Sequence, residues 1–188
     1  PPPSNNTNGT GGQTGSGEGK SNGGLSFLYD VPSDNAANSK AHGLLVLLHG
    51  SSASNYTRMV GMMQQVANLH GLIRVSVLAP NGRGWNEGGE SNAADSLHAL
   101  VQDEFFAKYN VDKSKIFFSG QSSGAGFLAS HFVAMHAKDY TGGAFMQCGA
   151  NAPRVQFAPD EATKKNFKLH FEITTGDSIW PQAYVQGT

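Results

Sequence analysis

The stretch KIFFSGQSSGAGFLAS, residues 115–130, joins a short apolar run to a helical pattern through a cluster of small residues. Its centre, Gly120-Gln121-Ser122-Ser123-Gly124, fits the spacing G-x-S-x-G. Glycines on both sides of a serine allow a strand to turn sharply into a helix and to present the serine hydroxyl at the turn. The same spacing arises by chance in a chain with 24 glycines, so the rest of the sequence must support a nucleophilic Ser122.

Short apolar runs alternate with helical patterns on both sides of this turn. Strands are expected at residues 25–29, 44–48, 74–78, 116–119, 144–148 and 169–174. Helices are expected at residues 55–69, at residues 93–109 and from the serine turn onward. In the first of these, Met59, Met62, Met63 and Val66 fall on one side. The alternation predicts an α/β fold with a mostly parallel sheet and helices on both faces.

The first 24 residues contain no large apolar side chain and are rich in Pro, Ser, Asn, Thr, Gly and Gln. Such a segment buries too little surface to offset the entropy lost on ordering. We therefore predict a flexible linker at residues 1–24 and one domain at residues 25–188. A leader of this composition is typical of an exported protein, so a secreted, periplasmic or surface-tethered location is expected.

Charge and hydropathy argue against several classes of partner. The formal net charge is -1, and the 13 Lys and Arg residues are scattered, which argues against nucleic-acid binding. The longest apolar run, GLLVLL at residues 43–48, has the length of a buried strand, so no membrane span is expected. Cys148 is the only cysteine, which excludes an internal disulfide, and it is expected inside a strand.

Three further loops are expected at the carboxyl edge of the sheet, where open parallel sheets place their sites. Each follows an expected strand: HGSSAS (49–54), APNGRGWN (79–86) and GDSIW (176–180). The first offers backbone N–H groups for a developing oxyanion, and the last two bring Trp85, Asp177 and Trp180 to the same edge. Either tryptophan is explained equally well as a core residue or as a wall of a substrate site.

These motifs, in this order, resemble the α/β-hydrolase superfamily, and within it the secreted polyhydroxybutyrate depolymerase-like and feruloyl esterase-like esterases. The resemblance extends from GLLVLLHGSSAS through YNVDKSKIFFSGQSSGAG to TTGDSIW and so covers nearly the whole domain. It implies that Ser122 is the nucleophile and that Asp177 orients the base. It also implies an oxyanion hole made by the amides of Ser51 or Ser52 and of Ser123. The order of serine before acid agrees with that of the superfamily, and no metal or organic cofactor is implied.

The catalytic base does not follow the acid in this chain. The superfamily places its histidine after the last strand, and the 11 residues that follow Asp177 contain none. His131 and His136 lie 9 and 14 positions along the helix from Ser122, which is roughly 13 to 21 Å along its axis. His49 is at the right edge but suits a loop-shaping role. We therefore expect the domain at residues 25–188 to be C-terminally incomplete. Its last strand and histidine loop are expected beyond Thr188, either in a continuing chain or in a separate C-terminal fragment produced by cleavage.

Two functions follow as hypotheses. The first is a serine carboxylic-ester hydrolase that forms an acyl-enzyme. By the resemblance, its substrate is a polyester, or a feruloyl or acetyl ester on plant polysaccharide. The second is a non-catalytic α/β-hydrolase-like domain that serves as a binding or surface module, and the absent base motivates it. Acyl transfer to an acceptor other than water would use the same residues as the first hypothesis.

Overall fold

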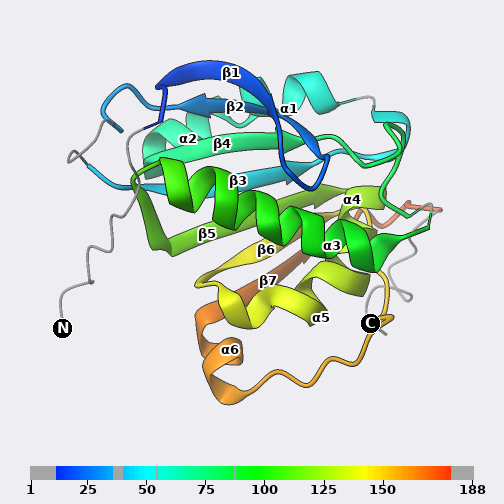
Figure 1. Cartoon of the computed structure of the whole chain (residues 1–188). Coiled ribbons are helices and arrows are strands. Elements are labelled where there is room, and N and C mark those ends of the chain that lie inside the picture. Colours follow the sequence, from blue (N-terminus) through cyan, green and yellow to red (C-terminus); the bar gives the residue numbers. More distant parts are fainter. Residues whose placement is uncertain (1–11, 36–39, 54, 87, 179–188) are drawn as a thin grey trace.

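The computed structural model describes residues 12–35, 40–53, 55–86 and 88–178. Within these ranges seven strands form one sheet in the order β1-β2-β4-β3-β5-β6-β7 (Figure 1). The strands are β1 (Gly15–Lys20), β2 (Ser26–Val31), β3 (His42–Leu48), β4 (Leu72–Val77), β5 (Val111–Gln121), β6 (Gly142–Gln147) and β7 (Phe167–Glu172). Strands β3 to β7 pair in parallel, whereas β1 and β2 run antiparallel at one end of the sheet.

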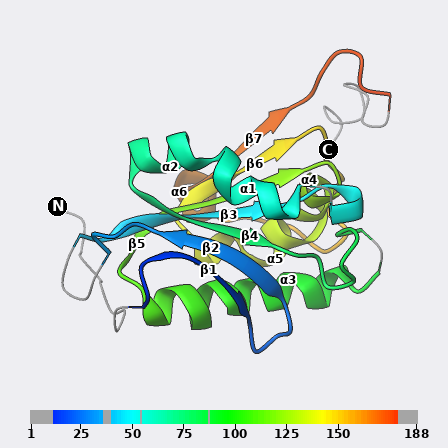
Figure 2. The same cartoon turned by 90° about the horizontal axis from the view of Figure 1, so that it is seen from above.

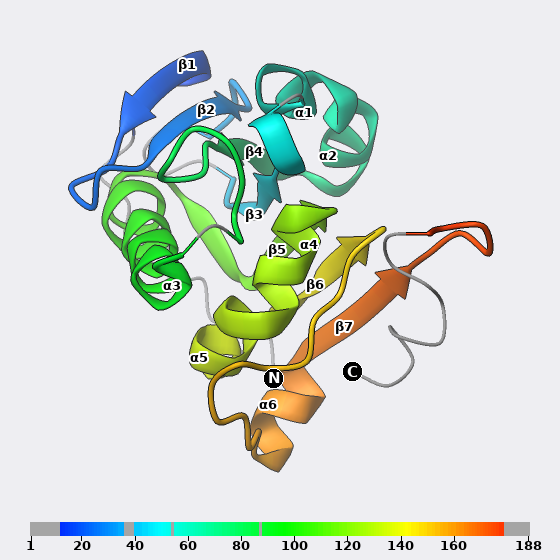
Figure 3. The same cartoon turned by 90° about the vertical axis from the view of Figure 1, so that its right-hand side faces the viewer.

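Helices cover both faces of this sheet, as the sequence predicts (Figures 2 and 3). One face carries α1 (Tyr56–Met62) and α2 (Gln64–His70). The other carries α3 (Glu90–Ala99), α4 (Ser123–Phe127), α5 (Val133–His136) and α6 (Glu161–Asn166). Two π-helical segments continue these helices: η2 (Leu100–Phe106) extends α3, and η3 (Leu128–Phe132) joins α4 to α5. The elements η1 (Ser51–Ala53) and η4 (Ala137–Asp139) are single 3-10 turns.

The central strands β3 and β4 are buried along their whole length. Parallel strands that are covered on both faces read as continuous apolar runs, which explains LLVLL in β3. Leu44, Leu47 and Leu48 are fully buried. Burial of each such side chain stabilises the fold by about 1.5–3 kcal/mol. The core therefore lies directly beneath the loops that follow β3 and β5.

The predicted linker needs correction, because β1 lies inside it. Gly15, Gly17 and Gly19 alternate along β1, which pairs antiparallel with β2. A Cβ at Gly17 would lie 2.4 Å from the Tyr29 hydroxyl oxygen, and one at Gly19 would lie 2.5 Å from the Phe27 ring. The glycines thus leave room for aromatic side chains of β2 to lie over β1. A segment without large apolar residues is ordered here by its partner's rings and by ladder hydrogen bonds. Residues 1–11 lie outside the described ranges.

The predicted helix at residues 55–69 is two helices that meet at Met63, whose backbone is not helical (φ −92°, ψ 10°). Met59 is buried against the sheet, but Met62 and Val66 are exposed. Met63, Val66 and Leu69 instead line an open groove of about 780 Å³. Across the groove lie Phe117, Phe145 and other residues of β5, β6 and β7. The predicted apolar stripe of this segment therefore packs on the core only in part.

Strand β7 forms one edge of the described sheet, since it pairs with β6 alone. Most of its residues are exposed. An edge strand presents unpaired N–H and C=O groups that invite pairing with another strand.

No described helix has the length and apolar character that crossing a bilayer requires.

Candidate active site at the carboxyl edge of the sheet

Ser122 occupies a strained turn between β5 and α4. Its backbone angles are φ 50° and ψ −112°, a conformation that L residues rarely adopt. Such strain costs on the order of 1–3 kcal/mol and persists only where the surroundings enforce it. Here the Ser122 N–H donates to the Gln147 carbonyl at 2.8 Å, and the Ser122 carbonyl accepts from the Gly126 N–H at 2.9 Å. The side chain is partly exposed, in contrast to the buried residues that follow it in α4.

The glycines of the G-x-S-x-G spacing are required by contact with backbone atoms. A Cβ at Gly120 would lie 2.6 Å from the nitrogen of Ala125, and one at Gly124 would lie 2.6 Å from the Leu48 carbonyl oxygen. A third glycine, Gly149, has a similar role, since its Cβ would lie 2.4 Å from the Ser122 carbonyl oxygen. The turn is therefore wedged between the ends of β3 and β6, and this fixes the position of the serine.

The loop after β3 lies beside Ser122. Leu48 pairs with Gly120, so continuing the parallel register sets Gly50 next to Ser122. A Cβ at Gly50 would lie 3.6 Å from the Cβ of Ser122. Beyond it, the single turn η1 has Ser52 in the left-handed region at φ 65°. The N–H of Ala53 donates to the Arg83 carbonyl at 2.9 Å, which ties this loop to the loop after β4.

His49 shapes this loop and is not available as a base. It is fully buried, and its Nε2 accepts from the Ala79 N–H at 3.0 Å. Its Nδ1 must then carry the proton, which it donates to the Gly50 carbonyl at 2.6 Å. Burial lowers the pKa of His49 despite this hydrogen bond, so the ring stays neutral.

The contact between His49 and Gly50 also orients the next amide. In a trans peptide the C=O and N–H bonds point in opposite directions. Because the Gly50 carbonyl faces the imidazole, the Ser51 N–H faces away from it. Ser51 and Ser52 are both exposed. The part of this loop that lies beside Ser122 is therefore its backbone.

Ser123 is the first residue of α4 and is buried. The first N–H groups of a helix have no partner within the helix, so the Ser123 amide is available at the turn. Its hydroxyl, by contrast, is enclosed and has no hydrogen-bond partner among the described residues. Ser123 can therefore serve the site through its backbone, and its hydroxyl is excluded as the nucleophile.

Asp177 follows β7 and Ser122 follows β5. The two strands run parallel and end at the same edge of the sheet (Figure 3). It lies in a turn in which its N–H donates to the Thr174 carbonyl at 3.2 Å. Strand β6 lies between β5 and β7, so two strand spacings, roughly 10 Å, separate their ends. The predicted nucleophile and acid thus follow strands that end at one edge of the sheet, with β6 between them.

All seven histidines lie in described residues, and none forms a hydrogen bond with the Ser122 hydroxyl. His42 is at the amino end of β3, where it contacts Asp34 and Asn35. His70 and His170 line the apolar groove. His131 is bonded to Ser130 within the helix. The hydrogen bonds and packing of these histidines thus involve groups other than the serine hydroxyl, and the identity of the base stays a prediction.

Of the two predicted substrate-contacting tryptophans, Trp85 is a core residue. It is 2% exposed and packs on the rings of Phe127 at 4.9 Å and His49 at 5.9 Å between centroids. The prediction of a substrate wall at Trp85 is corrected, because these rings cover it. Its Nε1–H has no hydrogen-bond partner among the described residues. Trp180 lies outside the described residues.

Two features of this edge were not found from the sequence. Cys148 was expected inside a strand, but it follows the end of β6 in a left-handed conformation at φ 48° and is only partly buried. Asn55 donates to the Gln121 side chain at 2.6 Å and so links the start of α1 to the residue before the serine. Neither feature has a sequence motif that would reveal it.

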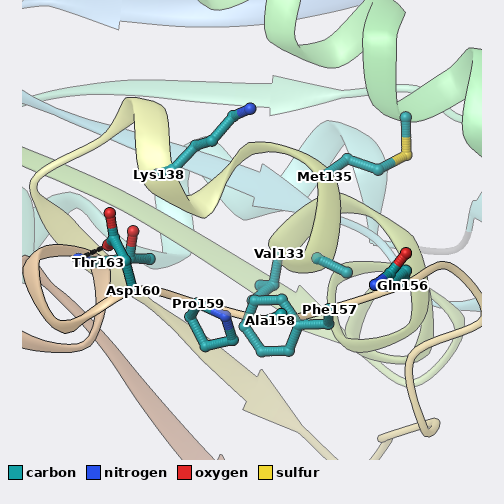
Figure 4. A pocket seen from close by; sticks show the side chains of 10 residues that line it. Val133, Met135, Lys138, Gln156, Phe157, Ala158, Pro159, Asp160 and Thr163 are labelled. Atoms are coloured by element: carbon teal, nitrogen blue, oxygen red, sulfur yellow. Dashed lines mark hydrogen bonds between the residues drawn. The ribbon is translucent and has the colours of Figure 1, made fainter.

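A cavity of about 310 Å³ lies between α5 and the loop before α6 (Figure 4). Phe157 and Pro159 of that loop face Val133 of the helix across it. Val133 is 11 residues along the helix from Ser122, or roughly 16 Å along its axis. The cavity is therefore separate from the serine turn.

Solved structures of several hydrolases share this arrangement of strands and helices. A thermostable esterase superposes on 91% of this chain and 49% of its own, with a TM-score of 0.63 and 17% identity. A protein from Klebsiella pneumoniae subsp. pneumoniae described as a dienelactone hydrolase superposes on 91% of this chain and 77% of its own, with a TM-score of 0.63 and 12% identity. Est1E from Butyrivibrio proteoclasticus superposes on 72% of this chain and 51% of its own, with a TM-score of 0.51 and 16% identity.

At these identities the likeness shows a shared fold. The chain spans about half the length of the thermostable esterase and of Est1E. No family model matches the sequence, and no curated protein matches it.

Proposed function

The chain has the α/β-hydrolase fold, and from that premise we propose that it belongs to a serine carboxylic-ester hydrolase with Ser122 as nucleophile. The observation that carries the proposal is the enforced turn at Ser122, with φ 50° and flanking glycines that contact backbone. Serine attacks an ester carbonyl, alcohol leaves, and water then releases the acid from the acyl-enzyme. Stored strain of this kind is characteristic of functional turns.

The oxyanion hole proposed here uses the amides of Ser51 or Ser52 and of Ser123. The first pair lies in the loop held by His49 and by the Arg83 carbonyl, and the last begins α4. Rigid donors cost no reorganisation when charge develops on the carbonyl oxygen, and loss of one donor typically costs about 2.7–4 kcal/mol of transition-state stabilisation.

Asp177 is proposed as the acid that orients a histidine base. Ser122 and Asp177 follow strands whose ends lie roughly two strand spacings apart, and the proposed imidazole would lie between them with a hydrogen bond on each side. The base is proposed to come from polypeptide outside this chain, either a continuation of it or a cleaved C-terminal fragment. A secreted, periplasmic or surface-tethered location is proposed on the composition of the leader and on the sequence resemblance. A polyester, feruloyl ester or acetyl ester substrate is proposed on the resemblance alone.

A fluorophosphonate probe tests the nucleophile in the complete polypeptide that contains this chain. We expect covalent labelling at Ser122, and loss of both labelling and p-nitrophenyl ester turnover in Ser122→Ala. Ser123→Ala is the matched variant, because it removes the neighbouring hydroxyl and keeps the backbone amide; it should still be labelled. Labelling that persists in Ser122→Ala would refute the proposal.

A non-catalytic binding module remains the second candidate function. The observation that favours it is that none of the seven histidines, all of them described residues, forms a hydrogen bond with the Ser122 hydroxyl. A folded complete polypeptide that resists the probe and hydrolyses no ester would support this reading. Product analysis with an added alcohol acceptor distinguishes hydrolysis from acyl transfer.

A further inference from the structure

Two histidines and two aspartates meet between α3 and the end of α5, on the face of the sheet that carries α3 to α6 and outside the serine site. His98 lies in α3, and His136 and Asp139 lie at the end of α5 and in η4. One nitrogen or oxygen donor from each of these three residues lies within 4.8 Å of the others. Asp95, one turn before His98 in α3, brings its Oδ1 to 3.1 Å from His136 Nε2. Each segment thus contributes one histidine and one aspartate three positions apart.

We propose that His98, His136 and Asp139 form a binding site for a zinc-class divalent metal ion, with Asp95 as an outer carboxylate. Two imidazoles and one carboxylate are a known donor set for zinc, and such sites keep a further position for water. Imidazole also suits cobalt, nickel and copper. The bound ion would join α3 to the end of the helix that begins at Ser122.

The contacts of His136 are those of a ligating histidine. Its Nδ1 lies 3.5 Å from Asp139 Oδ2, while its Nε2 faces Asp95. A histidine that binds metal through one nitrogen usually donates the proton of the other to a carboxylate. His136 can therefore bind the ion beside Asp139 through Nδ1 and donate to Asp95 from Nε2. The carboxylates compensate the charge of a divalent ion.

His98 is held in place from the other side. The Tyr140 hydroxyl lies 2.8 Å from its Nδ1, and Asp139 Oδ2 lies 4.0 Å from the same nitrogen. Asp139 Oδ2 therefore faces a ring nitrogen of each histidine. The rings of His98 and His136 are stacked at 4.4 Å between centroids. Convergence on one ion requires a turn of one ring about its Cβ–Cγ bond.

Other histidines of the chain lack this arrangement. His49 has both ring nitrogens bonded to backbone groups in the core. His42 is 3% exposed and contacts two side chains and a carbonyl. The side chains of His98 and His136 are 27% and 13% exposed, so an ion can reach them from solvent.

Titration of the untagged, EDTA-treated protein with Zn²⁺ and with Co²⁺ tests the site. We expect one equivalent of Zn²⁺ to bind, a rise in melting temperature that EDTA reverses, and visible absorption bands from bound Co²⁺. His98→Ala and His136→Ala should each weaken Zn²⁺ binding by at least about tenfold. His70→Ala, which removes an exposed histidine outside the cluster, is the matched control and should bind as the parent does.

Asp95→Asn separates an inner from an outer role for this carboxylate. As an outer partner it should weaken Zn²⁺ binding less than Asp139→Asn does. Absence of stoichiometric binding to the folded parent protein would overturn the proposal. Equal binding by His98→Ala, His136→Ala and the parent, with folding checked by circular dichroism, would overturn it as well. None of these measurements depends on ester hydrolysis.

Discussion

Substitution of Gly124 by alanine tests whether backbone contact at the serine turn sets the position of Ser122. Alanine is normally the better helix residue by about 1 kcal/mol, so helix propensity alone predicts stabilisation. At Gly124, however, the new Cβ would lie 2.6 Å from the Leu48 carbonyl oxygen and 2.8 Å from that of His49. Optimal contacts of this kind lie near 3.5 Å, so either α4 or the end of β3 must move.

The expected cost follows from these two opposing effects. Overpacking of a rigid site typically costs about 1–3 kcal/mol, and here both contacts are with backbone atoms that cannot rotate away. After the gain in propensity, we expect a net loss of about 2 kcal/mol. For a chain of this size that lowers the melting temperature by about 4–8 °C. Movement of α4 also displaces the Ser123 amide, so labelling of Ser122 by a fluorophosphonate should slow more than stability alone explains.

Gly61→Ala provides the matched control. Gly61 also lies within a helix, α1, but a Cβ there would meet no atom within 4 Å. This variant should gain about 0.5–1 kcal/mol and leave labelling unchanged. Thermal unfolding monitored by circular dichroism and the rate of probe labelling check both variants. If Gly124→Ala proves as stable as Gly61→Ala and labels at the parental rate, the argument from backbone contact fails.

Three further outcomes are expected from features of the core and surface. Trp85→Phe removes a buried N–H that has no hydrogen-bond partner among the described residues, which relieves a desolvation cost of about 1–3 kcal/mol, but it also loses some packing. The two effects oppose each other, so the free energy of unfolding should change by less than about 1 kcal/mol. Trp85→Ala should lower the free energy of unfolding by about 3–5 kcal/mol in chemical denaturation. Burial lowers the folded-state pKa of His49, so the unfolded chain binds protons more readily. The stability of the parent should fall relative to His49→Gln as pH drops below about 6.5, and parallel stability curves would contradict this. Leu69 is 80% exposed beside the apolar groove, so Leu69→Lys should reduce binding of a hydrophobic dye without a loss of melting temperature.

The sequence predicts the central part of the fold well because its signals are strong there. Continuous apolar runs identify β3 and β4, and the glycines around Ser122 identify the turn that the structure contains. Parallel register then brings the loop after β3 to Ser122, as its place at the carboxyl edge predicts. These features depend on local composition and on a regular sheet, both of which can be seen in one sequence.

The failures concern contacts between distant residues. Strand β1 has no apolar pattern of its own. Its glycines leave the space that the aromatic side chains of β2 fill, and this can be seen only once the two strands are paired. The burial of Trp85 depends on His49 and Phe127, which lie far from it in sequence. Likewise, no sequence motif predicts that Asp95 and His98 lie close to His136 and Asp139. The first two residues belong to α3 and the last two to α5 and η4, which are far apart in sequence.

The close backbone contacts around Ser122 fix the serine turn independently of the loops that surround it. Gly124 packs against Leu48 of β3, and Gly120 and Gly149 pack against the backbone of the turn itself, so Ser122 belongs to the region expected to exchange its amide hydrogens last. The surrounding loops can then vary in length and composition while the Ser122 hydroxyl keeps its position. With Ser122 as the proposed nucleophile, changes in these loops would alter the accepted acyl or alcohol group without moving the serine.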